Sequence, residues 1–331
     1  MSELRPELRT PLIELYPGAR HETLAGDAST RRFHRLFLAD GATCIVMDYG
    51  SAFERETDDV RLARIFARAD LPVARVLHVL PAAGALVVED LGDATLETAL
   101  THADVDRLPA RGDLYRSAVR LSVDIATRGT DALLRSDRAS GPALDEERFT
   151  FEMRFFLEHY IGSFLGRPEV PTEVQESVRA LATQTASHPR VLCHRDFHSR
   201  NIMVRPGGAL ALVDIQDARW GPDTYDVASL LRDAYVEIGE DEVDELFDHF
   251  CHQLPGIQDL GAIRKRLDVV AAQRMIKALG TFGYQIAVLG RERYRSSLRR
   301  TVERLIRVLP ARVETAPLAE VFLRHGCLSL S

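Results

Sequence analysis

Hydrophobic and polar residues alternate along most of the first ninety positions, a pattern typical of strands with one buried face. Turns rich in Gly, Pro and Asp separate the alternating segments. The pattern therefore indicates a small, mostly antiparallel sheet that carries one helix after an opening helix. We predict strands at His21–Ala25, Phe33–Leu38, Thr43–Met47, Arg75–Leu80 and Ala85–Glu89, with helices at 3–16 and Glu54–Arg68.

Beyond Asp93 the apolar spacing changes to that of helices. Leu114, Ala118, Leu121 and Ile125, for example, fall on one face of a long helix. The chain is therefore predicted to be an α+β protein, with a β-rich lobe at 1–91 and a larger, mainly helical lobe at 92–331. Further helical stretches are predicted at 146–160, 172–187, 226–238, 241–253, 259–289 and 292–308, with a loop at 130–145.

Composition narrows the functional classes. The 331 residues carry a net charge of −7 and a pI near 5.9, so a nucleic-acid footprint is not expected. Four widely scattered cysteines lack CxxC spacing, which suits a reducing compartment. No apolar run approaches the ~18 residues of a membrane span, and no signal-peptide core is present. We therefore expect a cytoplasmic protein with no membrane association and no obligate protein partner.

The most informative segment is His194–Asn201, followed thirteen positions later by Asp214. Two short predicted strands and a Pro206-Gly207-Gly208 turn lie between Asn201 and Asp214, which would bring the two side chains back together. Asp196 is positioned to orient and deprotonate an attacking hydroxyl. Asn201 and Asp214 would supply oxygen ligands to a magnesium ion on ATP phosphates.

Neighbouring residues have simpler interpretations. We expect His194 to brace the loop backbone, and Asp226 to cap the helix that it opens and to pin the catalytic loop. For Asp217, a position near the metal or phosphates and a turn-capping role remain equally open. His198 is a candidate substrate contact. A zinc site built from the nearby Cys193 and histidines fits no usual spacing.

A small-residue turn at Gly26–Thr30 lies between two predicted strands, where a phosphate-covering loop would lie. Backbone N–H groups and the hydroxyls of Ser29 and Thr30 would meet anionic phosphates there. The chain contains neither GxxxxGK[ST] nor GxGxxG, so a P-loop is excluded.

Together these motifs resemble the aminoglycoside phosphotransferase / choline kinase superfamily, whose members are small-molecule kinases with a protein-kinase-like, two-lobed fold. More narrowly, the chain looks like the bacterial anomeric N-acetylmuramate / N-acetylglucosamine kinases of cell-wall recycling. The segments that carry this narrower resemblance span nearly the whole chain: Gly26–Phe33, Ile45–Asp48, Glu89–Asp93, Cys193–Val204, Ile215–Arg219, Ser229–Asp233 and Gln273–Phe282.

The resemblance implies ATP and Mg²⁺ as cofactors, with adenine at the backbone near Glu89–Leu91 and an anomeric sugar hydroxyl as the acceptor. The third strand, however, reads Cys44–Asp48 and lacks the lysine that many relatives use to hold phosphates. Arg31 or Arg32 would replace this lysine. We predict Arg32, because only one of two adjacent strand residues faces the cleft. The acidic partner on the following helix stays open among Glu56, Asp58 and Asp59.

Gln216, Arg232, Arg274 and Lys277 are candidate acceptor contacts, because a carboxylate-bearing sugar would favour a nearby arginine. Two alternatives keep the fold and change the function. One is a kinase for an aminoglycoside or another hydroxylated metabolite. The other is a nucleotide-binding pseudokinase scaffold, which the missing strand lysine alone supports.

Overall fold

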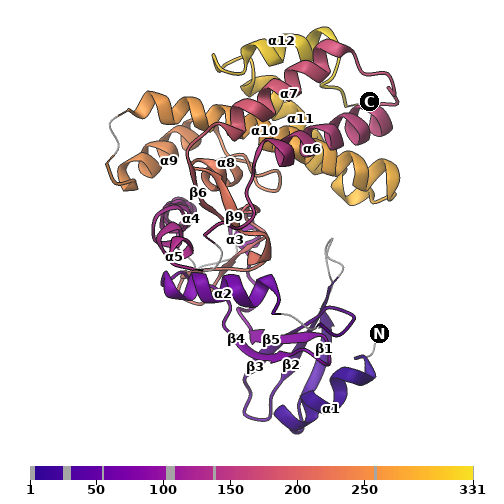
Figure 1. Ribbon diagram of the computed structural model, residues 1–331, viewed down its shortest axis with the longest axis vertical. Helices are drawn as coiled ribbons and strands as arrows, with labels where there is room; N and C mark the ends of the chain where they lie inside the picture. The colour runs from indigo at the N-terminus through magenta and orange to yellow at the C-terminus, as the bar shows by residue number, and fades with distance from the viewer. Residues whose placement is uncertain are drawn as a thin grey trace. The chain divides into compact units, whose positions relative to one another are not determined.

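The computed structural model describes residues 4–24, 31–53, 56–101, 109–136, 139–256 and 259–330. The chain forms two compact units (Figure 1). The first combines Met1–Ala94 with Met203–Gln216, and the second combines Thr95–Ile202 with Asp217–Ser331. The first stretch thus ends three residues beyond the expected boundary, and a segment of the expected helical lobe belongs to the first unit.

The first unit contains a five-stranded sheet in which all neighbouring strands are antiparallel. Each strand predicted from alternation is present, with its ends shifted by at most one residue. The order is β1-β2-β3-β5-β4. The strands are β1 (Arg20–Leu24), β2 (Arg32–Phe37), β3 (Thr43–Asp48), β4 (Val76–Leu80) and β5 (Ala85–Glu89).

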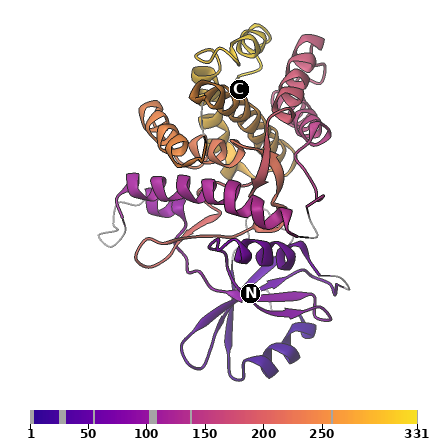
Figure 2. The ribbon, with the colours of Figure 1, turned by 60° about the vertical axis from the view of Figure 1, so that its left-hand side comes forward.

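The alternation along β3 and β5 divides the apolar side chains between two helices on opposite faces of this sheet (Figure 2). Helix α1 (Pro6–Leu15) packs with Cys44 and Val46 on one face, whereas α2 (Asp58–Arg68) places Val60 against the opposite face. Because side chains alternate with a period of two, both faces of the central strands are covered.

The hairpin of β7 (Ile202–Val204) and β8 (Leu210–Leu212) packs with the first unit through backbone and apolar contacts. The N–H of Leu212 donates to the carbonyl of Pro72 at 2.7 Å. Met203 and Ala211 are buried against Leu91. These pairings connect segments more than a hundred residues apart, which explains why local sequence pattern alone assigned the hairpin to the helical lobe.

The second unit is mainly helical, with one additional two-stranded sheet, β6 (Arg190–Cys193) with β9 (Arg219–Pro222). The predicted helices are present, but the structure differs from the prediction in several places. Helix α5 (Thr130–Leu134) occupies the start of the predicted loop, α8 ends at Leu231 rather than 238, and neither α3 nor α12 was predicted. The helical elements that follow β5 along the chain are α3 (Leu96–Thr101), α4 (Arg111–Asp124), η1 (Ile125–Gly129), α5, α6 (Glu146–Phe156), η2 (Leu157–Phe164), α7 (Thr172–Ala186), η3 (Ile215–Asp217), α8 (Tyr225–Leu231), α9 (Glu240–Gln253), α10 (Leu260–Gly283), η4 (Tyr284–Val288), η5 (Glu292–Tyr294), α11 (Arg295–Val308) and α12 (Ala316–Arg324).

Helix α10 lies at the centre of this unit and is buried on most of its circumference (Figure 1). Its C-terminal end approaches α6 and η2 closely, and glycines make that approach possible. A Cβ added at Gly280 would lie 2.8 Å from Cα of Phe156, and one at Gly283 would lie 2.6 Å from the carbonyl oxygen of His159. No helix of the described residues is long and apolar enough to span a membrane.

Replacing either glycine with alanine should therefore destabilise the protein. We expect Gly280→Ala and Gly283→Ala each to lower the free energy of unfolding by about 2 kcal/mol, since the helices must separate to admit the methyl group. Gly162→Ala is the matched control, because its Cβ would have ordinary contacts, 3.5 Å from the nearest atom. Urea unfolding measures all three, and wild-type stability in the first two variants would contradict the packing argument.

Candidate active site

The predicted catalytic loop follows β6 and is fixed by two carboxylates from the segment that follows β9. Asp226, the second residue of α8, accepts hydrogen bonds from the backbone N–H groups of His194 at 2.7 Å and Arg195 at 3.0 Å. Asp233 accepts one from the N–H of Ser199 at 2.8 Å. The predicted contact between Asp226 and the loop is thus present, but the predicted capping role is wrong, because Thr224 is the N-cap residue of α8 and the Asp226 carboxylate accepts from the loop instead. Buried N–H groups are satisfied by these carboxylates, so the loop has one defined conformation.

Arg195 has a φ of +81°, in the left-handed region that a bulky side chain rarely adopts. Its side chain is 10% exposed and forms an ion pair of 2.9 Å with Asp217, which also pairs with Arg219 at 2.6 Å. Strained backbone of this kind persists where surrounding contacts enforce it, and it is concentrated at functional sites. Asp217 therefore holds Arg195 in place. Of the two roles expected for Asp217, this contact favours the structural one over a place near the metal or phosphates.

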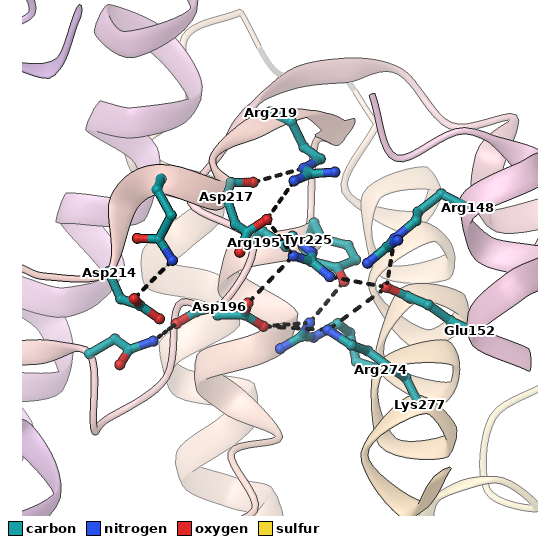
Figure 3. A network of polar contacts seen from close by, with 12 residues as sticks. Arg148, Glu152, Arg195, Asp196, Asp214, Asp217, Arg219, Tyr225, Arg274 and Lys277 are labelled. Atoms are coloured by element: carbon teal, nitrogen blue, oxygen red, sulfur yellow. Dashed lines mark hydrogen bonds and ion pairs between the residues drawn. The ribbon is translucent and has the colours of Figure 1, made fainter. Parts of the chain in front are cut away.

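Asp196 lies among three cationic side chains (Figure 3). Its carboxylate is 3.4 Å from Nζ of Lys277, 3.7 Å from Nη1 of Arg274 and 4.0 Å from Nη1 of Arg195. Arg274 also donates a 2.8 Å hydrogen bond to the hydroxyl of Tyr225, and its guanidinium lies over that ring. The structure therefore brings together Asp196 and two residues that the sequence offered only as candidate acceptor contacts.

The surrounding charges determine the protonation state of Asp196. Burial opposes its ionisation, but Lys277, Arg274 and Arg195 outweigh burial and hold the pKa of the carboxyl well below its usual range. Burial likewise lowers the pKa of Lys277, although the nearby carboxylates oppose this shift. Asp196 is consequently an ionised carboxylate at neutral pH, ready to accept a hydrogen bond from a hydroxyl.

Glu152 on α6 lies behind these cations and is only 4% exposed. Its carboxylate is 3.7 Å from both Arg148 and Arg195 and 3.9 Å from Lys277, and it accepts a 2.9 Å hydrogen bond from Gln273. Sequence reasoning missed this residue. The available signal was a charged residue on the apolar face that Phe149, Met153 and Phe156 define in α6.

Asn201 donates from Nδ2 to the carbonyl oxygen of Asp196 at 3.0 Å. This hydrogen bond closes the loop across five residues and leaves the amide oxygen as the group that can bind a cation. His198 is held nearby, because its N–H donates to the same carbonyl at 3.0 Å. Burial lowers the pKa of its imidazole, which is therefore neutral at pH 7.

Asp214 belongs to the first unit and has a φ of +61°, a conformation that Asp tolerates better than most residues. Its Oδ1 accepts hydrogen bonds from Nη2 of Arg31 at 2.8 Å and from Nε2 of Gln216 at 2.9 Å. Gln216, a candidate acceptor contact, therefore supports Asp214 directly. The Asp214 side chain is 41% exposed, so it remains accessible to a ligand.

Arg31 also forms an ion pair of 3.1 Å with Asp59 on α2, and Asp59 accepts a hydrogen bond from the hydroxyl of Tyr49. Burial opposes the charge on Arg31, but Asp59 and Asp214 outweigh it and raise the pKa of the guanidinium. Arg32, by contrast, is exposed and lies opposite Asp48 in the β2–β3 register. The contacts thus favour Arg31 over the predicted Arg32, and Asp59 over its two competitors.

The remaining predicted residues lie elsewhere or beyond the described part of the chain. Arg232 is occupied by Glu240, with two hydrogen bonds of 2.7 and 2.9 Å, so it is a buried structural residue rather than the predicted acceptor contact. Ser29 and Thr30 fall outside the described residues. The Glu89 side chain pairs with Arg75 and Arg205, and Leu91 is buried with Met203, so a nucleotide contact there would use the backbone.

The donor set fits magnesium better than zinc. Within the ranges that the structure describes, no three His, Cys, Asp or Glu side chains are grouped to hold a metal ion. Magnesium needs few protein ligands, since it retains waters and binds phosphate oxygens, and it prefers carboxylate and amide oxygens. Asp214 and Asn201 offer those two groups.

Comparison with known proteins finds phosphotransferases, in agreement with the arrangement of this site. The model of the phosphotransferase enzyme family APH matches residues 20–264. The chain is 29% identical over 305 residues to the N-acetylmuramate/N-acetylglucosamine kinase of Neisseria meningitidis serogroup B, with 89% of this chain and 87% of the relative covered. It is 27% identical to the protein of the same name from Pseudomonas putida, with 92% and 88% covered.

A solved structure, the gentamicin complex of APH(2″)-IIa, superimposes with a TM-score of 0.60 at 13% sequence identity. The alignment covers 95% of this chain and 99% of that one. This likeness confirms the predicted α+β, two-lobed kinase fold.

Proposed function

The chain belongs to the phosphotransferase enzyme family, and we propose that it transfers the γ-phosphoryl group of ATP to the anomeric hydroxyl of N-acetylmuramate or N-acetylglucosamine. The names of its relatives, aligned over about nine-tenths of the chain, support this acceptor. A role in cell-wall sugar recycling in the cytoplasm is part of the same proposal. It is consistent with the four free, buried cysteines.

The positive charge around Asp196 is the observation that favours an amino sugar as the acceptor. Three cationic side chains, those of Lys277, Arg274 and Arg195, lie within 4.0 Å of the Asp196 carboxylate (Figure 3). An excess of cations repels a polycationic aminoglycoside and tolerates a neutral or anionic sugar. N-acetylglucosamine is neutral and N-acetylmuramate carries a carboxylate, so both fit this charge distribution.

Asp196 would accept the proton of the acceptor hydroxyl as phosphoryl transfer proceeds. An Asp with a lowered pKa is a weak base, which suits an anomeric hydroxyl because a hemiacetal is more acidic than an ordinary alcohol. Lys277 and Arg274 would stabilise negative charge that develops beside Asp196. Positioning and charge stabilisation are the main requirements of phosphoryl transfer.

Arg31 would neutralise the ATP phosphates in place of the strand lysine. Its guanidinium already pairs with Asp59, as a strand lysine would pair with a helix carboxylate, and it also reaches Asp214. A planar guanidinium can bind phosphate with two hydrogen bonds. If Arg31 takes the role of the strand lysine, the pseudokinase alternative is weakened, since the missing lysine was its only support.

Asp214 and Asn201 would hold magnesium, which supplies charge neutralisation at the phosphate oxygens when bound. The backbone of Glu89–Leu91 is proposed to contact adenine.

The function is tested first by removing the two carboxylates. We expect Asp196→Asn to lower kcat by about 10²- to 10⁴-fold through loss of the base, and Asp214→Asn to abolish magnesium-dependent turnover. ADP release is measured with N-acetylglucosamine, N-acetylmuramate and a panel of aminoglycosides, and circular dichroism checks folding. The exposed Asp248→Asn on α9 is the control. Normal rates in both site variants, or turnover confined to aminoglycosides, would refute the proposal.

The two adjacent arginines give a matched pair of variants. We expect Arg31→Ala to lower kcat/KM for ATP by about 10- to 100-fold, the effect of losing a charge-assisted hydrogen bond, and Arg32→Ala to change it less than about twofold. Steady-state kinetics at saturating sugar measure both variants. A larger defect in Arg32→Ala would restore the assignment made from sequence.

The cations around Asp196 predict a pH effect. Because Lys277 helps to hold the pKa of Asp196 down, Lys277→Met should raise that pKa and move the acid limb of kcat/KM to higher pH. Wild-type activity should persist below the usual Asp range and fall only as Asp196 becomes protonated. Lys265→Met removes the only other lysine, which is 68% exposed, and should leave the profile unchanged. An acid limb that does not move would show that Asp196 is not the titrating base.

A further inference from the structure

Two rows of side chains, half-buried except for the buried Glu152, continue from the Asp196 network along neighbouring helices of the second unit. On α6 and η2 the row is Arg148, Glu152, Phe155 and His159, and on α10 and η4 it is Arg274, Lys277, Thr281 and Tyr284. Their spacing of three or four residues keeps each row on one helix face. The helices run in the same direction, because Glu152 bonds Gln273 whereas His159 lies beside Gly283.

At the far end of both rows, three aromatic rings form a cluster of Phe155, His159 and Tyr284. The ring centroids of Phe155 and His159 are 4.2 Å apart, those of His159 and Tyr284 are 4.9 Å apart, and those of Phe155 and Tyr284 are 5.6 Å apart. Each ring remains partly exposed. Gly280 and Gly283 bring the two helices close enough for these rings to meet.

The aromatic cluster lies within reach of an acceptor held at Asp196. Tyr284 follows Lys277 by seven residues, as His159 follows Glu152, so each row advances by about 10 Å from the cations to the rings. That interval corresponds to one substituted sugar ring. The hydroxyl of Thr281 lies between the two ends on α10. Nδ1 of His159 is buried with no hydrogen-bond partner among the described residues, so a polar ligand group could satisfy it.

From this alignment we propose that Phe155, His159 and Tyr284 form the acceptor platform, on which the apolar face or the acetamido group of the sugar rests while its anomeric hydroxyl meets Asp196. The proposal rests on the proposed function and adds the residues that select the acceptor. Flat aromatic rings match the C–H groups on one face of a pyranose and the methyl of an acetamido group. Apolar walls with a few oriented polar groups are typical of small-molecule sites.

Three rings would also suit a quaternary ammonium ligand. The neighbouring charges argue against such a ligand here, because Lys277 and Arg274 lie at the end of the rows where the reacting hydroxyl must be placed. A cationic acceptor would have to bind next to both of these groups. A neutral or acidic acetamido sugar meets no such repulsion.

Tyr284→Ala and Phe155→Ala test the platform. We expect each to raise the KM for N-acetylglucosamine at least tenfold, with the KM for ATP and kcat changed less than threefold, because uniform binding of the acceptor is lost. Tyr284→Leu retains apolar volume and protects the fold, and it should also raise the sugar KM because the flat ring is gone. Leu260→Ala, at the start of α10 and 54% exposed, is the matched control and should keep wild-type constants.

Binding measured without turnover separates this proposal from the proposed function. In an Asp196→Asn background, calorimetric titration with N-acetylglucosamine should show affinity that Tyr284→Ala weakens at least tenfold. Equal affinity with and without Tyr284, or no binding in the parent, would overturn the platform. Failure of the wild-type enzyme to phosphorylate any amino sugar would instead overturn the proposed function, whatever the titration shows.

Discussion

The active-site region depends on one electrostatic constraint, the partial burial of Asp196 among three cations with the buried Glu152 behind them. Desolvating charged groups is costly unless they compensate one another with good geometry. The network therefore requires α6, α10 and the catalytic loop to keep their positions, since displacing any one leaves a buried charge unpaired. The glycines of α10 serve the same requirement, because they let the helices approach until Glu152 and Gln273 share a hydrogen bond. The close packing of α6 against α10 and the charge network around Asp196 thus depend on each other.

The conformation of the catalytic loop is fixed by carboxylates that lie outside the loop. Asp226 and Asp233 accept hydrogen bonds from loop N–H groups, and Asp217 fixes Arg195 in a left-handed conformation. None of the three carboxylates needs to touch a substrate. Their role is to prevent relaxation of a backbone that would otherwise be strained, which keeps Asp196 oriented before a ligand arrives. Preorganisation of this kind lowers the cost of reaching the transition state.

Sequence patterns predicted the elements well because alternation and helical spacing are local properties. All five strands of the first sheet were located in this way, and the loop carrying Asp196 was located from its motif and the spacing to Asp214. Contacts between residues that are distant in the sequence could not be predicted from these local patterns. Whether Arg31 or Arg32 reaches Asp214 depends on where β2 begins and on its register with β3, which a strand pattern does not determine. Glu152 was missed because a single charge on an apolar helix face is meaningful only when its partners, from other parts of the chain, are known. The hairpin of β7 and β8 joins the first unit through contacts with Pro72 and Leu91, which no local signal predicts.

We expect local charge, rather than net charge, to select the acceptor of this chain. The chain carries a net charge of −7, which taken alone would favour a cationic acceptor such as an aminoglycoside. Electrostatic interactions between exposed groups are screened within about 10 Å at ordinary ionic strength, so the distant surface contributes little at the site. The partly buried groups beside Asp196 are screened far less, and cations predominate among them. The same cations also keep the base ionised. A site that needs positive charge to hold its base ionised therefore disfavours positive acceptors, and catalysis and specificity follow from one set of side chains.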